Sequence, residues 1–232
     1  MIARAMVLAA GRGERLRPLT DSLPKPLFEV GGKALIDHVL DRLAEVGVTQ
    51  AVVNLWHLGP LIEAHLAGRE SPAVAFTHEP ERLDTGGGVA NALPLLGNDP
   101  FYLVNGKILW RDGATGALAR LAHAWNDDAM DGLLLVLPKA RAGGYGGPGD
   151  FFLHRDSAVS RPDAGALAPL VFTGIQILHP RLFEAAPEGP FSLNLLYDRA
   201  MAAGRLSGMV HDSDWLHVAT PEGLVEAQTW FK

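Results

Sequence analysis

Cysteine is absent from this 232-residue chain, and its absence excludes disulfides, thiolate metal sites and a cysteine nucleophile. Long apolar runs are scarce as well. The apolar stretch near the N-terminus is too short to span a membrane, and Gly11 and Gly13 interrupt it where a signal peptide would still be apolar. We therefore expect a soluble protein of the cytoplasm with no membrane partner.

An excess of positive charge is also missing. The formal net charge is −6 and the pI is about 5.8. Proteins that bind nucleic acid or anionic membranes present basic surfaces, so we expect neither partner. Apolar residues make up 48% of the chain, which is enough to bury a sizeable core. No feature of the composition indicates an oligomeric state.

Several widespread site motifs are absent too. A Walker A loop needs Gly-Lys followed by Ser or Thr, and a common zinc motif needs His-Glu-x-x-His; the chain has neither. A dinucleotide-binding fingerprint needs a third glycine where Leu16 stands, and an acidic residue after the second strand, where the chain reads Leu55-Trp56-His57. The glycines at 11 and 13 therefore need another explanation.

What the chain does contain is an alternation of strand-like and helix-like patterns through its first half. Short apolar runs predict strands at 5–9, 51–55, 74–77, 101–105 and 133–137, and apolar residues at helical spacing predict helices at 35–43, 58–66, 88–93 and 115–125. This alternation indicates an α/β fold, namely a Rossmann-like mixed, mostly parallel sheet with helices on both faces. Ligands bind such sheets at the carboxyl ends of the strands.

The sequence pattern changes after Pro138. Five glycines within 142–149 predict a mobile loop. Beyond it we predict strands at 151–153, 159–160, 170–178, 205–211 and 215–218, and helices at 193–203 and 221–230. We expect a single domain over residues 1–232, in which residues 138–232 add a smaller β-rich subregion over the cleft of residues 1–137.

The first strand leads directly into a loop that combines glycines with cations. Gly11 and Gly13 would let backbone N–H groups approach a ligand closely. Four cations follow within a few residues: Arg12, Arg15, Arg17 and Lys25. Such a loop suits a nucleoside triphosphate and the pyrophosphate it releases. The alternative, solvated surface cations, applies to Arg12 and Arg17 rather than to Arg15 and Lys25.

A second glycine-rich segment reads Asp84-Thr85-Gly86-Gly87-Gly88. Glycine in a helix interior costs about 1 kcal/mol against alanine, so three in a row at a helix start need a reason. A flat nucleobase lying against bare backbone would supply one. A tight hairpin is the alternative.

The chain resembles the sugar-phosphate nucleotidyltransferases, whose signature has the form L-A-A-G-x-G-x-R-L-x-P-L-T-x-x-x-P-K-P. Residues 8–26 match it in order and in spacing. Within that family the chain is most similar to compact bacterial uridylyltransferases that act on N-acetylmuramate-1-phosphate. The resemblance implies a GT-A-like nucleotidyltransferase fold and attack of a sugar-1-phosphate oxygen on the α-phosphorus of UTP, giving a UDP-sugar and pyrophosphate. Guanylyl or thymidylyl transfer to a hexose-1-phosphate is the rival within the family.

The resemblance also implies roles for particular residues. Arg15 would hold the β- and γ-phosphates, and Lys25 would hold the α-phosphate. Residues 1–137 would form the nucleotide-binding half and 138–232 the sugar-phosphate-binding half. The nucleotide contacts would be Leu8, Ala10, Gly11, Gly13, Thr85, Gly86, Gly87 and Asn105, and the sugar-phosphate contacts Gly149, Asp150, Thr173, Gly174 and Asn194. For Asn194, a role in opening the helix alone is an equal alternative.

The chain departs from the family at both positions where aspartates hold Mg²⁺. Lys107 stands in Asn105-Gly106-Lys107, where the family has Asn-Gly-Asp, and His217 stands in the late Trp-x-Asp-Val-Gly-Thr segment. Neither an ammonium nor an imidazole is a good ligand for this hard cation.

Three explanations remain open for this departure. Lys107 supplies the charge at the α-phosphate itself, or a metal sits on the nucleotide phosphates and another carboxylate, or the chain only binds nucleotides. Asp84 and Asp112 are candidate carboxylates, whereas Asp214 points away from the face of His217 because strand side chains alternate. We favour an active enzyme because the rest of the site is complete.

Overall fold

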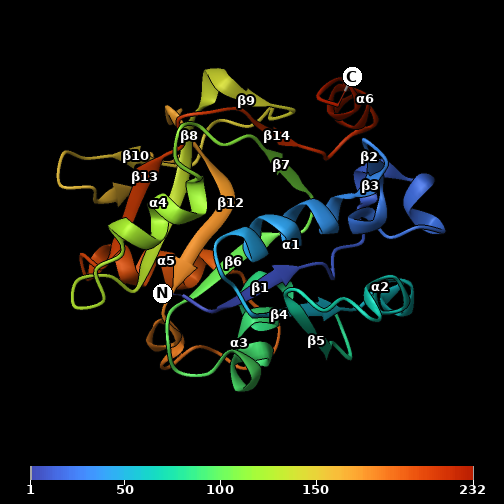
Figure 1. Cartoon of the computed structure of the whole chain (residues 1–232). Helices are drawn as coiled ribbons and strands as arrows, with labels where there is room; N and C mark the ends of the chain where they lie inside the picture. Colours follow the sequence, from blue (N-terminus) through green and yellow to red (C-terminus); the bar gives the residue numbers. More distant parts are fainter. Residues whose placement is uncertain (1, 232) are drawn as a thin grey trace.

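A seven-stranded sheet runs through the middle of the molecule (Figure 1). The structure is a computed structural model and describes residues 2–231. The strands lie in the order β13 (Leu206–Val210), β8 (Gly132–Pro138), β12 (Leu170–Leu178), β6 (Phe101–Asn105), β1 (Arg4–Leu8), β4 (Gln50–Leu55) and β5 (Ala73–His78). Adjacent strands pair in parallel except around β12, which runs antiparallel to β6 and β8. The predicted mixed, mostly parallel sheet is confirmed.

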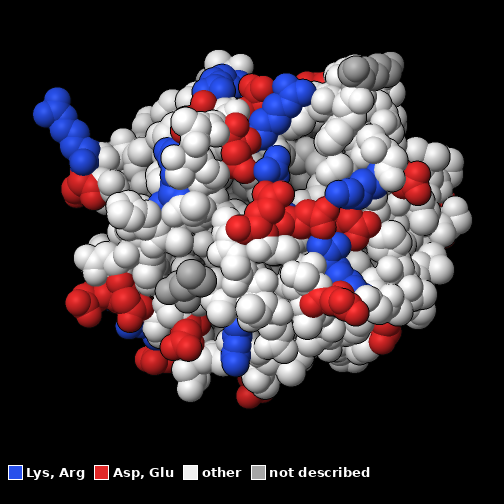
Figure 2. Space-filling view, viewed as in Figure 1, with Lys and Arg blue, Asp and Glu red and all other residues white. Residues whose placement is uncertain are grey.

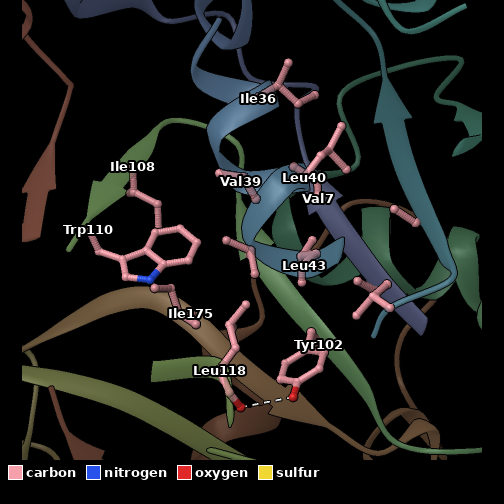
Figure 3. Close-up of a cluster of buried hydrophobic side chains, with 14 of the residues drawn as sticks. Val7, Ile36, Val39, Leu40, Leu43, Tyr102, Ile108, Trp110, Leu118 and Ile175 are labelled. Carbon is pink, nitrogen blue, oxygen red and sulfur yellow. Dashed lines mark hydrogen bonds between the residues drawn. The ribbon is translucent and has the colours of Figure 1, made fainter. Parts of the chain in front are cut away.

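One face of the sheet carries α1 (Leu35–Glu45), α2 (Gly59–Leu66) and α4 (Ala117–Ala124). Apolar residues of α1 recur every three or four positions, which places them on one side of the helix. Figure 3 shows Val39, Leu40 and Leu43 packing towards Val7 of β1. The helix ends where Gly47 adopts a φ of 86°, and the Val48 N–H donates to the carbonyl of Leu43.

The opposite face carries α3 (Asp84–Leu96) and α5 (Asn194–Ala202). Successive side chains of β1 point to opposite faces, so Met6 packs here whereas Val7 packs under α1. Both residues are fully buried. The sheet is therefore covered on both faces, as the alternation of elements predicts.

Within the described part of the chain, three small sheets flank the main sheet. β14 (Trp215–His217) pairs with β7 (Ile108–Trp110) and with β9 (Ala142–Gly143), β2 (Glu29–Val30) pairs with β3 (Lys33–Ala34), and β10 (Phe152–Leu153) pairs with β11 (Val159–Ser160). The last helix, α6 (Pro221–Thr229), packs against β14 and β2. A third apolar cluster, which includes Leu16, Val30, Leu216 and Ala227, joins the glycine loop to the C-terminal helix.

Three predictions about local structure need correction. α3 begins at Asp84 and includes the glycine run, which the sequence pattern places before the helix. Residues 108–110 form β7, which was not predicted. Within the glycine-rich segment, Ala142–Gly143 forms β9 instead of being wholly a loop, because it pairs with β14.

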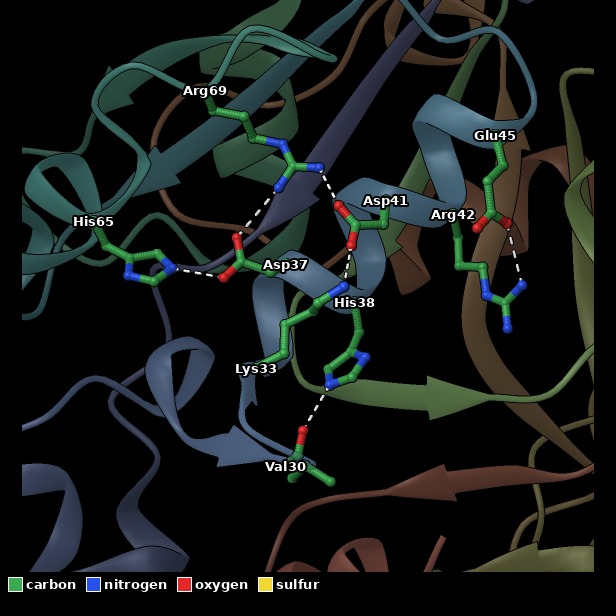
Figure 4. A network of polar contacts seen from close by, with 9 residues as sticks. All are labelled: Val30, Lys33, Asp37, His38, Asp41, Arg42, Glu45, His65 and Arg69. Atoms are coloured by element: carbon green, nitrogen blue, oxygen red, sulfur yellow. Dashed lines mark hydrogen bonds and ion pairs between the residues drawn. The ribbon is translucent and has the colours of Figure 1, made fainter. Parts of the chain in front are cut away.

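The outer side of α1 is charged and carries ion pairs (Figures 2 and 4). Arg69 bridges Asp37 and Asp41, while His65 contacts Asp37 and Lys33 contacts Asp41. Partly exposed pairs like these stabilise a fold by about 1 kcal/mol or less each. They tie α1 to the end of α2 and to β3. No helix within residues 2–231 has the length and apolar character needed to cross a membrane.

Candidate nucleotide-binding site

A pocket of about 470 Å³ opens at the carboxyl ends of β1, β4, β5 and β6. The chain passes from β1 to β4 and β5 on one side, and then crosses to β6 on the other side of β1. Such a reversal of strand order is where open α/β sheets bind ligands. Most of the predicted nucleotide and catalytic residues line this pocket: Leu8, Ala10, Gly11, Gly13, Arg15, Lys25, Thr85, Asn105 and Lys107.

The loop after β1 is shaped by one glycine and left open at another. Gly13 has a φ of 67° and begins the short 3₁₀ turn Glu14–Leu16, closed by a hydrogen bond of 2.8 Å from the Leu16 N–H to the Gly13 carbonyl. A Cβ on Gly13 would lie 2.8 Å from Cγ2 of Thr20. A Cβ on Gly11 would meet nothing within 4 Å. The fold therefore requires Gly13, while Gly11 leaves space that a ligand can fill.

Two buried polar residues at the base of the pocket were missed by the sequence analysis. The Ala9 N–H donates to Asn54 Oδ1 at 2.8 Å, and Asn54 Nδ2 donates to Glu79 Oε1 at 2.6 Å. Glu79 Oε2 accepts from the Leu83 N–H at 3.1 Å. This relay fixes the loops after β1, β4 and β5 relative to one another. Its one signal in the sequence is a lone Asn in the apolar run 51–55.

Cations converge on one side of the pocket. Burial, together with Lys107 and Arg15 nearby, lowers the pKa of Lys25 to about 7. Burial and the charges of Arg15 and Arg82 lower the pKa of Lys107 in the same way. Within residues 2–231 no carboxylate counters either shift. Arg82 was not singled out from the sequence. The pocket lining thus carries five cations against three carboxylates, an excess of positive charge that suits a polyanion.

The residues at the two expected metal positions lie next to each other. Lys107 occupies the turn between β6 and β7, and His217 of β14 is the register partner of Ile108. Burial, followed by the charges of Lys107, Lys25 and Arg15, lowers the pKa of His217 to about 3. The imidazole is therefore neutral at physiological pH. The spatial relation of the two positions agrees with the resemblance, although their chemistry does not.

These residues do not fit a divalent cation. Among residues 2–231, no group of three His, Asp or Glu side chains is placed to hold a metal. Asp112 Oδ1 accepts from the Ala117 N–H, and Asp214 pairs with Arg111, so neither faces the pocket. Asp84 lines the pocket, but its Oδ1 already accepts from the Thr85 N–H. The described residues therefore offer no protein-held site for a divalent cation.

The glycine run in α3 is explained by close packing. The N–H groups of Gly86 and Gly87 both donate to the carbonyl of Phe191. A Cβ on Gly86 would collide with the Phe191 ring, and one on Gly87 would collide with the carbonyl of Gly189. Neither glycine lines the pocket. Their contact with a nucleobase remains a prediction, and the Thr85 hydroxyl is occupied in accepting from the Leu193 N–H.

The predicted sugar-phosphate residues lie outside the pocket lining. Thr173 is buried and donates its hydroxyl to the carbonyl of Leu135 at 2.7 Å. Gly174, with a φ of 80°, packs directly against the side chain of Asn105, which does line the pocket. The register between β12 and β8 shifts between Phe172 and Gln176, and Gly174 lies within this shift. The contact of Gly174 with Asn105 therefore connects the acceptor region to the nucleotide pocket.

The other three predicted acceptor residues are also engaged with protein. Asp150 Oδ2 accepts from the Phe172 N–H at 2.8 Å. The Gly149 N–H donates to the hydroxyl of Tyr145. Asn194, at the start of α5, accepts from Arg161 on an exposed surface. Contact of these residues with a sugar phosphate stays a prediction.

Comparison with known proteins agrees with this geometry. Residues 4–147 match the family described as Nucleotidyl transferase. The chain is 43% identical, over 97% of its length and 95% of the relative, to N-acetylmuramate alpha-1-phosphate uridylyltransferase of Caulobacter vibrioides. It is 40% identical, over 97% and 96%, to the protein of that name in Neisseria meningitidis. UDP-glucose pyrophosphorylase from Acinetobacter baumanii has the same fold, with a TM-score of 0.79, 19% identity and coverage of 100% and 93%. The chain belongs to the nucleotidyl transferase family.

Proposed function

We propose that this chain transfers UMP from UTP to N-acetylmuramate-1-phosphate, giving the UDP-sugar and pyrophosphate. The observation that carries the proposal is the electropositive pocket at the switch point of the sheet, where Gly11, Arg15 and Lys25 converge. Identity of 43% over nearly the whole chain to a uridylyltransferase acting on that sugar phosphate supports the choice of substrates. We propose that the reaction takes place in the cytoplasm, where nucleoside triphosphates are available.

The geometry supports a mechanism based on positioning and charge. The phosphate of a sugar-1-phosphate is already ionised at neutral pH, so the step needs no general base. Gly11 leaves open space in which backbone N–H groups can meet the triphosphate. Arg15 would hold the β- and γ-phosphates that leave as pyrophosphate, and Lys25 would face the α-phosphate. Preorganised charges of this kind supply much of the rate enhancement in phosphoryl-type transfers.

The acceptor would enter from the side of β12. We propose that residues 138–232 supply the sugar-phosphate contacts, because Gly174 packs against Asn105 at the pocket. Gly149, Asp150, Thr173 and Asn194 are the proposed surroundings. Several of their polar groups are occupied by protein partners. The contacts with the sugar phosphate would therefore come from backbone groups of these residues, and from side-chain oxygens that still have a lone pair to accept from a sugar hydroxyl.

Guanylyl transfer is a second candidate, favoured by Glu79. Its carboxylate lines the pocket, and beside the bonds that it accepts from Asn54 and from the Leu83 N–H it has lone pairs left to accept from a base. Uracil presents one imide N–H to such a group, whereas guanine presents an N–H and an amino group side by side. We expect UTP because the chain is so similar to two uridylyltransferases.

Pyrophosphate release from a panel of substrates tests the proposal. UTP, GTP and dTTP would each be offered with N-acetylmuramate-1-phosphate, glucose-1-phosphate or mannose-1-phosphate. We expect the highest kcat/KM for UTP with N-acetylmuramate-1-phosphate. Binding of UTP without pyrophosphate release from any pair would contradict the proposal and favour a nucleotide-binding role.

A further inference from the structure

We infer that Lys107 is a catalytic residue that neutralises the α-phosphate together with Lys25, so that nucleotidyl transfer by this chain requires no divalent cation. The inference rests on the proposed function, whose substrates bring the phosphates into the pocket. It concerns the turn at which the resemblance places a metal-binding aspartate.

The turn that carries Lys107 is fixed against the end of β1. The Gly106 N–H donates to the Leu8 carbonyl at 3.0 Å. A Cβ on Gly106 would lie 3.0 Å from Val7 Cγ1 and 3.1 Å from that carbonyl. The backbone of the turn therefore lies directly against the strand that leads into the glycine loop. A lysine anchored there acts as a positioned point charge in the pocket that it lines.

The surroundings of Lys107 oppose a divalent cation and favour an anion. Burial, followed by repulsion from Arg15 and Arg82, lowers the pKa of Lys107, and the charge of Lys107 adds to the effect of burial in lowering the pKa of Lys25 and of His217. A divalent cation placed among these groups would be repelled and would find a neutral imidazole instead of a carboxylate. A triphosphate would be attracted, and its charge would favour the protonated form of both lysines.

The chemical step needs positive charge but no proton transfer from the protein. An oxygen of the sugar phosphate forms a bond to the α-phosphorus. The bond from the α-phosphorus to the bridging oxygen breaks, and pyrophosphate leaves with the electron pair. The non-bridging oxygens of the α-phosphate remain anionic throughout, so an ammonium beside them stabilises the transition state. Lys107 keeps its proton and is regenerated without further chemistry.

Turnover by the wild-type chain in excess EDTA is the first test, compared with turnover in added Mg²⁺. We expect the two rates for UTP and N-acetylmuramate-1-phosphate to differ by less than about tenfold, which is about 1.4 kcal/mol in barrier. A larger loss in EDTA would overturn the inference and leave the proposed function standing. No turnover in either condition would contradict the proposed function itself.

Lys107→Met removes the charge and keeps most of the side-chain volume. We expect turnover in EDTA to fall by about 100-fold, the size of effect found when a single stabilising group is removed. Lys33→Met is the matched control, because Lys33 lies outside the pocket and pairs with Asp41 on the outer side of α1, and it should retain wild-type turnover. A fall of less than about tenfold in Lys107→Met would overturn the inference. Thermal unfolding of both variants checks that they fold.

Lys107→Asp provides a readout that does not depend on activity. Mn²⁺ binding without nucleotide is measured by water proton relaxation. We expect the variant to bind Mn²⁺ at least about tenfold more tightly than wild type, since the change replaces a repelling ammonium by a carboxylate. Equal Mn²⁺ binding by the two proteins would overturn the inference, because the lysine would then not govern the charge at this point.

Discussion

Gly11 faces open space beside the pocket, whereas Gly86 and Gly87 face protein. Both segments are unusually rich in glycine, and both border residues that line the pocket. Around Gly11 the missing side chain leaves room for a ligand. Around Gly86 the missing side chain admits the ring of Phe191, so that α3 and the segment before α5 lie in contact. A glycine cluster thus identifies close approach but not the partner that approaches.

The difference extends to the polar groups of the two regions. In α3, the N–H groups of Gly86 and Gly87 already donate to the Phe191 carbonyl. Beside the glycine loop, Lys107 repels Lys25, and the five cations of the pocket lining outnumber its three carboxylates. The first region is complete within the protein. The second has an excess of positive charge that a bound anion would balance.

The largest effect is expected for Gly86→Ala. The added methyl would collide with the Phe191 ring, and overpacking of this kind costs about 1–3 kcal/mol. We expect a loss of about 2 kcal/mol in the free energy of unfolding after the gain in helix propensity of about 1 kcal/mol is included. Denaturant unfolding measures it, with the exposed Asn91→Ala in the same helix as the control. An unchanged stability would show that α3 and Phe191 can separate easily.

A smaller loss is expected for Gly13→Ala. Its φ of 67° is unfavourable for alanine by about 1–2 kcal/mol. The Cβ would also crowd Thr20, whose hydroxyl donates to the Gly13 carbonyl at 3.1 Å. We expect the free energy of unfolding to fall by about 1.5 kcal/mol. If the variant instead kept its full stability and lost affinity for UTP, Gly13 would serve ligand binding, as proposed for Gly11, and not the fold.

Gly11→Ala should weaken ligand binding without affecting stability. Its Cβ would stand in open space, so the fold has no reason to resist it. A bound triphosphate would meet that methyl, and we expect a Kd for UTP about tenfold higher, or about 1.4 kcal/mol. Calorimetric titration measures the affinity and thermal unfolding the stability. Wild-type affinity in this variant would show that the phosphates do not approach Gly11.

Features of the site that lie within a short stretch of sequence could be predicted, whereas contacts between distant residues could not. The glycine loop and its cations lie within 8–26, so the sequence pattern alone indicated a phosphate site there. Asn54 and Glu79 were missed because their contact joins the ends of β4 and β5, which are 25 residues apart. The packing of Gly86 was missed for the same reason, since Phe191 is far away in sequence.

The fold was predictable to a similar degree. Long apolar strands such as β6 and β8 carry their own signal, because burial on both faces needs continuous apolar residues. β7 has three residues and exists because β14 pairs with it. The parallel pairing of β13 with β8 is likewise set by distant partners. Pairing between distant short segments therefore determined what the sequence pattern missed.

The smallest expected effect is the uptake of protons when UTP binds. Lys25, with a pKa of about 7 in the free protein, is mostly neutral at pH 8. The triphosphate raises that pKa, so binding at pH 8 should take up a fraction of a proton, and affinity should fall as pH rises above 7.

Titration in buffers of different ionisation enthalpy measures this uptake. Lys25→Arg is the comparison, because arginine stays charged and should show less uptake. The free protein provides a second check on the sign. Because the unfolded chain keeps the Lys25 proton up to its ordinary pKa of 10.5, it binds more protons between pH 7 and 10.5. Stability without UTP should therefore rise with pH across that window. Proton release on UTP binding, or a free energy of unfolding that falls between pH 7 and 10.5, would contradict this prediction. Lys25 would then already be charged in the free protein, and the pocket would not depend on its ligand for charge balance.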